Sequence, residues 1–260
     1  LPISYGAPVL PVIIDQNALT FIIHTYGAGQ RAEVSLNDPS GVLRLSNGLY
    51  TKKPGQRCGL SYNLDDNHLL TLKGCVAPRR EPYVERISLK DPASNAIGIV
   101  KMAIRHWNVS VTGQVIQGSM PMSAKLMNSH ASDSLPIILA DTLKPSNNVF
   151  ANALYFKVGQ VYWKKTATWQ NSGLAVKAIL EKYAKVPMQS ATIVDGAGLS
   201  RDNRVSPMQA VELLYSMEQK FALSDDFISA LPVPGQKGTM AHRYIAPNHL
   251  QKQIHAKTGT

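Results

Sequence analysis

The stretch Leu143-Lys-Pro-Ser-Asn-Asn-Val-Phe-Ala-Asn-Ala-Leu154 places a polar turn between two predicted helices. Pro136 lies in the first turn of the earlier helix, and Pro145 ends that helix because its ring cannot continue the backbone hydrogen bonds. Asn148 opens the later helix, in which apolar residues recur at helical spacing. The hydroxyl of Ser146 and the amide of Asn148 are therefore presented together at a junction of two helices.

Further helices are predicted after this junction. Gly159 is the predicted stop of the helix that Asn148 opens, and an apolar stripe from Ala175 to Tyr183 marks the next helix. Ser206-Pro207 caps and begins another. Its predicted inward-facing residues are Val211, Leu214, Tyr215 and Phe221. Residues 119–260 therefore read as a mainly helical second domain.

The sequence pattern of residues 1–118 predicts a small β-rich domain. Short apolar or β-branched runs at residues 19–26, 41–45, 69–72 and 83–89 are separated by turn residues. One helix is predicted after Asp91-Pro92, and a further strand is predicted at residues 110–116. The chain as a whole is expected to combine helices and strands in two domains.

Cys58 and Cys75 each lie in a segment that reads as extended chain. The polar cluster Asp65-Asp66-Asn67-His68 between them predicts a hairpin that could bring the two thiols together. A disulfide and a pair of buried reduced thiols both remain open from the sequence. Neither cysteine belongs to a Cys-x-x-Cys or Cys/His cluster, so we expect no metal site.

The composition is that of a folded globular protein with a basic surface. Hydrophobic residues make up 44% and charged residues 17% of the 260 residues, and the formal net charge is +10. The basic residues are scattered rather than clustered, so nucleic acid is not expected as a partner. No apolar run is long enough for a transmembrane segment, and no secretory signal is visible at the start of the sequence.

The Ser146-Asn147-Asn148 turn carries side chains suited to peptide chemistry. A serine hydroxyl can pass a proton to a departing amine, and an asparagine amide can both donate and accept hydrogen bonds. The alternative is structural, because Ser and Asn also cap helices. The pattern alone does not separate these two interpretations.

The last four residues, Lys257-Thr-Gly-Thr260, alternate with the preceding residues as in a strand. Lys257 supplies a cation for a substrate carboxylate, and the hydroxyls of Thr258 and Thr260 add donors. Gly259 carries no side chain, so a substrate could lie against the strand edge. The backbone N–H of Thr260 could face a developing oxyanion. An ordinary lysine followed by a turn glycine is the alternative.

The block Asp195-Gly-Ala-Gly-Leu-Ser-Arg201 looks at first like a phosphate loop. It lacks the Gly-Lys-Ser/Thr ending of a P-loop and the spacing of a dinucleotide fingerprint, so we reject that interpretation. We expect Gly196 and Gly198 to permit a tight turn beside a cleft. Ser200 helps to shape this turn, and hydrogen bonds accepted by Asp195 and donated by Arg201 hold it.

In this order and spacing, the three motifs resemble those of the low-molecular-mass class C penicillin-binding proteins, a family of serine-type D-alanyl-D-alanine carboxypeptidases and endopeptidases. Val205-Ser-Pro207, Leu231-Pro232 with Gly238, and the two cysteine segments extend the resemblance over nearly the whole chain. The resemblance implies an α/β (α+β) fold: a penicillin-binding, β-lactamase-like transpeptidase domain interrupted by inserted β-rich domains. Residues 1–118 would belong to the inserts, and residues 119–260 to the later half of the catalytic domain.

By this resemblance, Ser146 and Asn148 belong to the second catalytic motif, and Lys257, Thr258 and Gly259 to the third. It further implies peptidoglycan stem peptides as substrates, β-lactams as inhibitors, a periplasmic location and no cofactor.

The first motif of the family, a nucleophilic serine with lysine three positions later, is missing, because no serine in the chain has that neighbour. We therefore expect the chain to be the later part of a longer protein, with the nucleophile before Leu1, and to be inactive alone. A non-catalytic cell-wall binder that retains the cleft is the alternative. A polyanion-binding protein is a third hypothesis, suggested only by the net charge.

Overall fold

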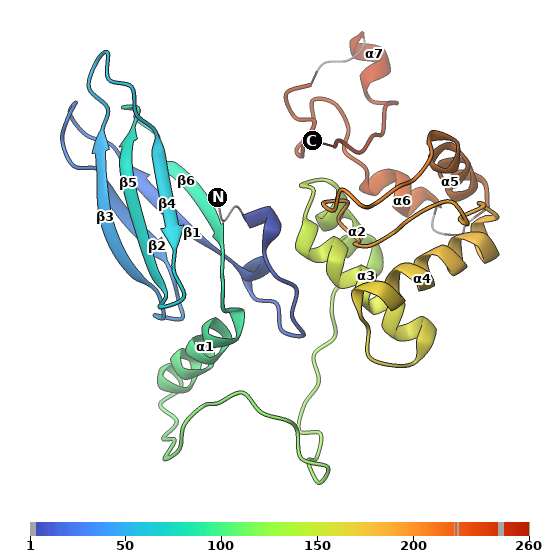
Figure 1. The fold of residues 1–260 in the computed structure, drawn as a ribbon, viewed down its shortest axis with the longest axis horizontal. Helices are drawn as coiled ribbons and strands as arrows, with labels where there is room; N and C mark the ends of the chain where they lie inside the picture. Colours follow the sequence, from blue (N-terminus) through green and yellow to red (C-terminus); the bar gives the residue numbers. More distant parts are fainter. Residues whose placement is uncertain (1–3, 221, 223, 244–246, 260) are drawn as a thin grey trace. The chain divides into compact units, whose positions relative to one another are not determined.

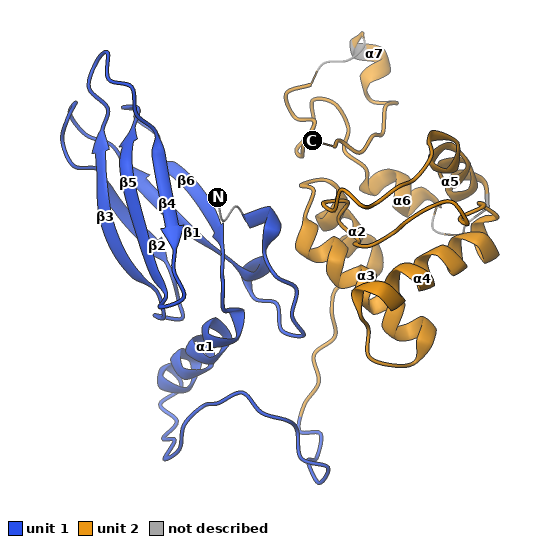
Figure 2. Ribbon diagram, viewed as in Figure 1, with its two compact units in different colours: residues 1–127 blue, residues 128–260 orange. Residues whose placement is uncertain are grey.

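The structure is a computed structural model that describes residues 4–220, 222, 224–243 and 247–259. The chain forms two compact units, Leu1–Met127 and Asn128–Thr260 (Figure 2). All the strands of the described residues lie in the first unit, and the second unit is built from helices and loops (Figure 1). The predicted mixture of helices and strands is confirmed.

The first unit contains two three-stranded sheets. The strands are β1 (Ala18–His24), β2 (Glu33–Asn37), β3 (Arg44–Thr51), β4 (Leu60–Leu64), β5 (Leu69–Val76) and β6 (Tyr83–Ser88), preceded by the short helical turns η1 (Ser4–Gly6) and η2 (Asp15–Asn17). One sheet has the order β2-β1-β6 and is antiparallel throughout. The other has the order β3-β5-β4, in which β3 and β5 run parallel and β4 and β5 antiparallel.

The two sheets share one hydrophobic core. Phe21 and Ile23 of β1, Leu49 of β3, and Leu70 and Leu72 of β5 are all fully buried in this cluster. Phe21 and Ile23 are two residues apart, as are Leu70 and Leu72, so the two side chains of each pair point to the same face of their sheet. Burial of such side chains from both sheets is what stabilises a unit of this size.

The predicted hairpin around the cysteines is confirmed, and it carries a disulfide. β4 pairs with β5 in the register Leu60 with Gly74, which brings Cys58 and Cys75 to a Cα–Cα distance of 5.7 Å. The Asp65 side chain accepts hydrogen bonds from the N–H groups of Asn67 and Leu69 and so shapes the turn. Of the two alternatives left open by the sequence, the bonded cysteines are the ones observed.

Removal of this disulfide should destabilise the first unit. The bridge joins residues 17 positions apart, and closing a loop of that size restricts the unfolded chain, which is worth about 3 kcal/mol. We expect the double variant Cys58→Ala/Cys75→Ala to lose about that much unfolding free energy, measured by urea denaturation with hydrogen exchange of β4 and β5 as the readout. A midpoint equal to that of the oxidised wild type would contradict this expectation.

The helix predicted after Asp91-Pro92 is α1 (Pro92–His106), which Asp91 caps by accepting a hydrogen bond from the N–H of Ser94 at 3.0 Å. The strand predicted at residues 110–116 is wrong. That segment is irregular, and Val111 and Ile116 are 50% and 73% exposed. A strand needs a neighbour to complete its hydrogen bonds, and no described strand pairs with these residues.

The second unit contains the helices α2 (Leu135–Leu143), α3 (Asn148–Trp163), α4 (Trp169–Ile179), the π-helical turn η3 (Leu180–Ala184), α5 (Pro207–Lys220), α6 (Ser224–Ala230) and α7 (Asn248–Gln251). The predicted helix starts at Asn148 and Pro207 are confirmed. A small core forms around the segment after η3, with Val186 and Met188 buried against Leu180, Ile193 and Leu213.

Gly159 does not end α3, as the sequence had predicted. The helix continues to Trp163 and ends where Lys164 adopts a left-handed conformation, with φ of 53°. A Cβ atom at Gly159 would lie 2.8 Å from the Cα of Ser172 in α4. The glycine therefore allows α3 and α4 to pack closely, which is a tertiary role that local sequence rules do not reveal.

The predicted inward face of α5 is also wrong. Val211, Leu214 and Tyr215 are 60%, 53% and 61% exposed. Gln209 and Ser216 are buried instead, and Leu213 packs against the small core. Gln209 sets this orientation, because its side chain donates to the carbonyl of Pro187 at 2.5 Å and accepts from the N–H of Ser206 at 2.8 Å. Phe221 lies outside the described residues.

The strand predicted for the end of the chain is not formed at residues 253–259. Residues 254–259 are irregular, and no described strand pairs with them. The backbone is tied instead by a hydrogen bond from the N–H of Ala256 to the carbonyl of Pro232 at 3.0 Å. One such bond does not make a ladder, which needs pairing along the whole segment.

Candidate active site

Ser146 lies in the turn between α2 and α3 in an uncommon backbone conformation. Its φ is +60°, a region that residues other than glycine seldom occupy. The turn is closed by hydrogen bonds from the N–H of Ser146 to the carbonyl of Leu143 at 3.3 Å and from the N–H of Asn147 to the carbonyl of Thr142 at 2.8 Å. Such strain persists only where the surrounding structure holds it, and it is frequent at functional sites.

Asn147, and not Ser146 or Asn148, caps helix α3. The Asn147 side chain accepts a hydrogen bond from the N–H of Phe150 at 3.2 Å, and Asn148 is the first residue of the helix. The capping alternative for Ser146 is therefore not what the structure shows. The Ser146 hydroxyl is available for another partner.

That partner is Lys257, which lies 111 positions later in the chain. The Nζ atom of Lys257 donates to the Oγ atom of Ser146 at 2.8 Å and to the carbonyl of Thr258 at 2.9 Å. Two of the residues proposed as catalytic are thus in direct contact. An ammonium group and a hydroxyl at hydrogen-bond distance form a path along which a proton can move.

Burial lowers the pKa of Lys257 below the ordinary value of a lysine. The cause is desolvation, because a charged ammonium loses water when it is brought against the protein. A lowered pKa increases the fraction of the neutral amine at a given pH. This shift suits a group that exchanges a proton with a neighbouring hydroxyl.

Thr258, the residue after Lys257, makes a hydrogen bond to a third segment of the unit. The Oγ1 atom of Thr258 donates to the Oγ1 atom of Thr239 at 2.9 Å. Gly259 is exposed, and a Cβ atom built on it would meet nothing within 4 Å. Thr260 lies outside the described residues, so its predicted contribution remains a prediction.

The Asp195 loop forms the tight turn expected from its glycines. The Asp195 carboxylate accepts hydrogen bonds from the N–H groups of Gly198 at 2.6 Å and Ser200 at 2.7 Å, and from the Asn203 amide at 2.9 Å. Gly198 has φ of +74°, and the N–H of Asp202 donates to the Ser200 hydroxyl. Arg201 was expected to help hold this loop, but it is exposed and makes no hydrogen bond within the described part of the chain.

Asn152 of α3 anchors the same loop, although none of the sequence motifs includes it as a site residue. Its Oδ1 atom accepts from the N–H groups of Gly196 at 2.9 Å and Ala197 at 3.0 Å. A Cβ atom on Gly196 would lie 2.6 Å from the carbonyl of Ala151, so only glycine allows the loop this close to the helix. The available signal was a polar residue one helical turn after Asn148 in an otherwise apolar run.

We expect Asn152→Ala to destabilise the second unit by about 2 kcal/mol. The substitution leaves two backbone N–H groups of the loop without an acceptor in a half-buried setting. Urea unfolding followed by tryptophan fluorescence measures the loss. Gln160→Ala, on the exposed face of the same helix, should change the unfolding free energy by less than about 0.5 kcal/mol. Equal effects of the two substitutions would contradict the anchoring role.

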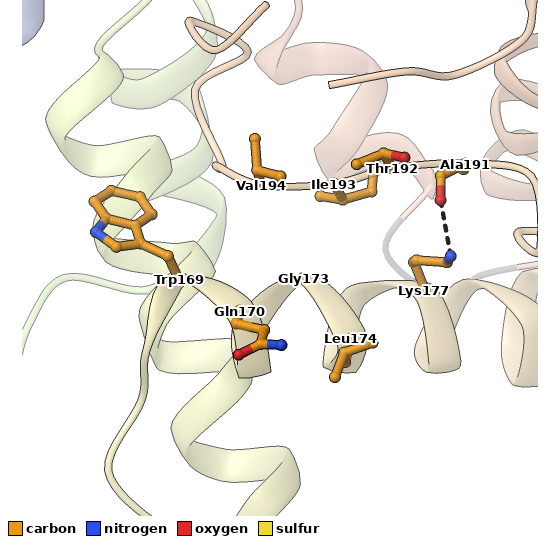
Figure 3. A pocket seen from close by; sticks show the side chains of 9 residues that line it. All are labelled: Trp169, Gln170, Gly173, Leu174, Lys177, Ala191, Thr192, Ile193 and Val194. Atoms are coloured by element: carbon orange, nitrogen blue, oxygen red, sulfur yellow. Dashed lines mark hydrogen bonds between the residues drawn. The ribbon is translucent and has the colours of Figure 1, made fainter. Parts of the chain in front are cut away.

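A groove of about 370 Å³ lies between α4 and residues 191–194 (Figure 3). Its walls include Trp169, Leu174 and Ile193, and the Nζ atom of Lys177 spans one end by donating to the carbonyl of Ala191 at 2.8 Å. The Tyr155 hydroxyl donates to the carbonyl groups of two lining residues, Trp169 at 2.6 Å and Ile193 at 3.3 Å. Neither Ser146 nor Lys257 lines this groove, so it is separate from the contact described above.

Tyr155 is the most strongly shifted titrating group near the groove. Burial, together with the negative charge of Asp195, raises the pKa of its hydroxyl to about 12. The hydroxyl is therefore a donor and not a base, which fits a structural role between α3 and α4.

Within the described ranges, no three side chains of His, Cys, Asp or Glu gather as a metal site. None of the described helices has the length and apolar character to cross a membrane.

Comparison with known proteins finds relatives of this chain. The chain is 31% identical over 208 residues to D-alanyl-D-alanine carboxypeptidase DacB of Haemophilus influenzae, a match that covers 78% of this chain and 42% of that protein. It is 28% identical over 277 aligned positions to a D-alanyl-D-alanine carboxypeptidase of Actinomadura sp. strain R39, covering all of this chain and 50% of that protein. The chain thus spans about half the length of these relatives.

Solved structures agree with the sequence matches. The crystal structure of penicillin binding protein 4 (dacB) from Haemophilus influenzae superposes with a TM-score of 0.82 and 26% identity, over 100% of this chain and 58% of that chain. The same protein in complex with a novel β-lactam gives a TM-score of 0.79 and 26% identity, over 98% and 60% of the two chains. The expected fold class, a penicillin-binding α/β fold, is confirmed. Because the profile of the D-Ala-D-Ala carboxypeptidase 3 (S13) family matches residues 1–260, the chain belongs to that family.

Proposed function

We propose that the protein containing this chain is a serine-type D-alanyl-D-alanine carboxypeptidase or endopeptidase that cleaves peptidoglycan stem peptides through an acyl-enzyme. β-Lactams would acylate the same serine. The observation that carries the proposal is the 2.8 Å hydrogen bond between Ser146 and Lys257, residues 111 positions apart in a member of this family. The names of its relatives, D-alanyl-D-alanine carboxypeptidases, support the same reaction.

Each residue of the two motifs has a role in this proposal. Ser146 passes a proton toward the departing amine, and Lys257 exchanges that proton and attracts the terminal carboxylate of the substrate. Asn148 binds a substrate amide from the first turn of α3, and Thr258 adds a hydroxyl. Gly259 leaves open space for the substrate backbone, and the N–H of Thr260 would face the oxyanion. Asp195, Gly196, Gly198 and Ser200 shape the neighbouring loop.

The nucleophile is assigned to a segment that this chain does not contain. No serine here is followed by lysine three positions later, and the chain spans 42% to 50% of its carboxypeptidase relatives. In this proposal the chain alone forms no acyl-enzyme. Residues 1–118 are assigned to inserted domains and residues 119–260 to the later half of the catalytic domain. The Cys58–Cys75 disulfide supports a periplasmic location, because disulfides persist in oxidising compartments.

The test is to incubate the complete protein with a fluorescent penicillin and, separately, with a peptide that ends in D-alanyl-D-alanine. We expect covalent labelling that survives denaturation, release of D-alanine from the peptide, and loss of both after preincubation with unlabelled penicillin. Binding to purified peptidoglycan with no labelling and no release would favour the non-catalytic cell-wall binder. Binding that ignores stem peptides but weakens steeply with salt would favour the polyanion binder.

A further inference from the structure

We propose that Thr239 is a positioning residue, which holds the Lys257-Thr258-Gly259 segment against the Ser146 turn. The inference rests on the proposed function, because it concerns the geometry of the same site. It adds a third segment, residues 228–241, to the two motifs that the sequence identified.

Thr239 touches both motifs at once. Its backbone N–H donates to the carbonyl of Lys144 at 2.9 Å, two residues before Ser146. Its side-chain oxygen accepts a hydrogen bond from the Oγ1 atom of Thr258 at 2.9 Å, one residue after Lys257. A single residue therefore links the turn that carries the hydroxyl to the segment that carries the ammonium group.

The loop that carries Thr239 is closely fitted to the Ser146 turn. Gly238 has φ of +137°, and a Cβ atom on it would lie 2.8 Å from the carbonyl of Lys144. The loop is closed by hydrogen bonds from the N–H of Gly235 to the carbonyl of Met240 and from the N–H of Ala241 to the carbonyl of Gly238. The Met240 side chain is 2% exposed, which anchors the loop in the unit. Thr239 is thus presented on a constrained support.

The Lys257 segment depends on this support, since no strand of the described residues pairs with it. Besides the bond from Thr258 to Thr239, it is tied by the bond from the N–H of Ala256 to the carbonyl of Pro232 and by the His255 ring Nδ1, which lies 2.9 Å from the carbonyl of Ile228. All three ties go to residues 228–241. The Thr239 bond is the one that follows Lys257 in the chain, so it limits how far the ammonium group can swing from Ser146.

Thr239→Val removes the hydroxyl while nearly keeping the shape of the side chain. We expect the second-order rate constant for labelling of the complete protein by penicillin to fall about tenfold, because the reacting groups lose their alignment. Thr239→Ser keeps the hydroxyl and should stay within about twofold of the wild type. Thr192→Val, an exposed threonine of the same unit whose side chain makes no hydrogen bond in the described chain, is the matched control and should also stay within about twofold.

Hydrogen exchange of the complete protein gives a readout that does not depend on activity. In Thr239→Val the amides of residues 256–259 should exchange faster than in the wild type, whereas the amides of α4, in the same unit, should be unchanged and so report that this unit is folded. Labelling and exchange equal to those of Thr192→Val, or failure of Thr239→Ser to restore them, would overturn the inference. If the wild type is not labelled at all, the proposed function fails, and exchange at residues 256–259 alone decides the role of Thr239.

Discussion

Replacing Lys257 with alanine in the complete protein should lower the second-order rate constant for acylation by penicillin about a thousandfold. The substitution removes the donor that lies 2.8 Å from the Ser146 hydroxyl, together with the cation proposed to attract the carboxylate of the ligand. Proton transfer by a positioned group is worth about 10²- to 10⁴-fold, and loss of a preorganised donor costs about 10²- to 10³-fold. Quenched-flow labelling over a range of penicillin concentrations measures this constant.

Lys252→Ala is the matched control for Lys257→Ala. Lys252 lies five residues earlier, is exposed, and has no hydrogen bond or ion pair from its side chain within the described residues. We expect it to label at the rate of the wild type, so a large loss in Lys257→Ala would not be a general effect of removing one positive charge. Equal rates for Lys257→Ala and the wild type would remove Lys257 from the proposed mechanism.

The lowered pKa of Lys257 has its own consequence for stability. Because desolvation disfavours the charged form in the folded state, the unfolded chain binds this proton more tightly than the folded chain. The resulting destabilisation is absent above the ordinary pKa of lysine and appears as the pH falls through that value toward the folded pKa. The unfolding free energy of the wild type should therefore rise more steeply with pH just below 10.5 than that of Lys257→Ala.

Replacing Ser146 with alanine should lower the same rate constant about a hundredfold. The Lys257 ammonium then loses its hydroxyl partner, and no group remains to pass a proton toward the departing nitrogen. The effect should appear both in penicillin labelling and in release of D-alanine from a peptide. The substitution should change the free energy of unfolding, measured by urea denaturation, by less than about 1 kcal/mol, because Asn147 and not Ser146 caps α3.

Ser190→Ala serves as the control for Ser146→Ala, because Ser190 is an exposed serine of the same unit with only a long contact, 3.4 Å, from the amide of Gln209. Its labelling rate should equal that of the wild type. If Ser146→Ala keeps more than half of the wild-type rate for both penicillin and peptide, the hydroxyl is not the proton relay. The role would then pass to another group near Lys257.

Much of the local structure could be predicted from short sequence signals. Pro145 and Asn148 marked the junction of α2 and α3, and Ser206-Pro207 marked the start of α5, because caps and proline act within a few residues. The hairpin around Asp65 was predicted for the same reason, and it brought the two cysteines together. Signals of this kind depend on the backbone of one segment only.

The errors fall where a local signal was outweighed by packing. Gly159 reads as a helix stop, but it is a contact point for Ser172 of the next helix. The apolar residues Val211 and Leu214 were predicted to face the core, but α5 buries the face that carries Gln209, whose side chain donates to the carbonyl of Pro187. Residues 110–116 have strand-like composition, but no strand of the described residues pairs with them. In each case the outcome depends on whether another segment supplies a partner.

The amino-acid sequence by itself determined the helix starts, the cysteine hairpin, the motifs and membership of the family, since these are properties of residues near one another or of their order. Only the tertiary structure decided that Ser146 meets Lys257, that Asn147 takes over the capping of α3, and that Thr239 lies between the two motifs. The physical reason is that a hydrogen bond requires two atoms within about 3 Å. The path of the whole chain, and not the spacing along it, sets that distance.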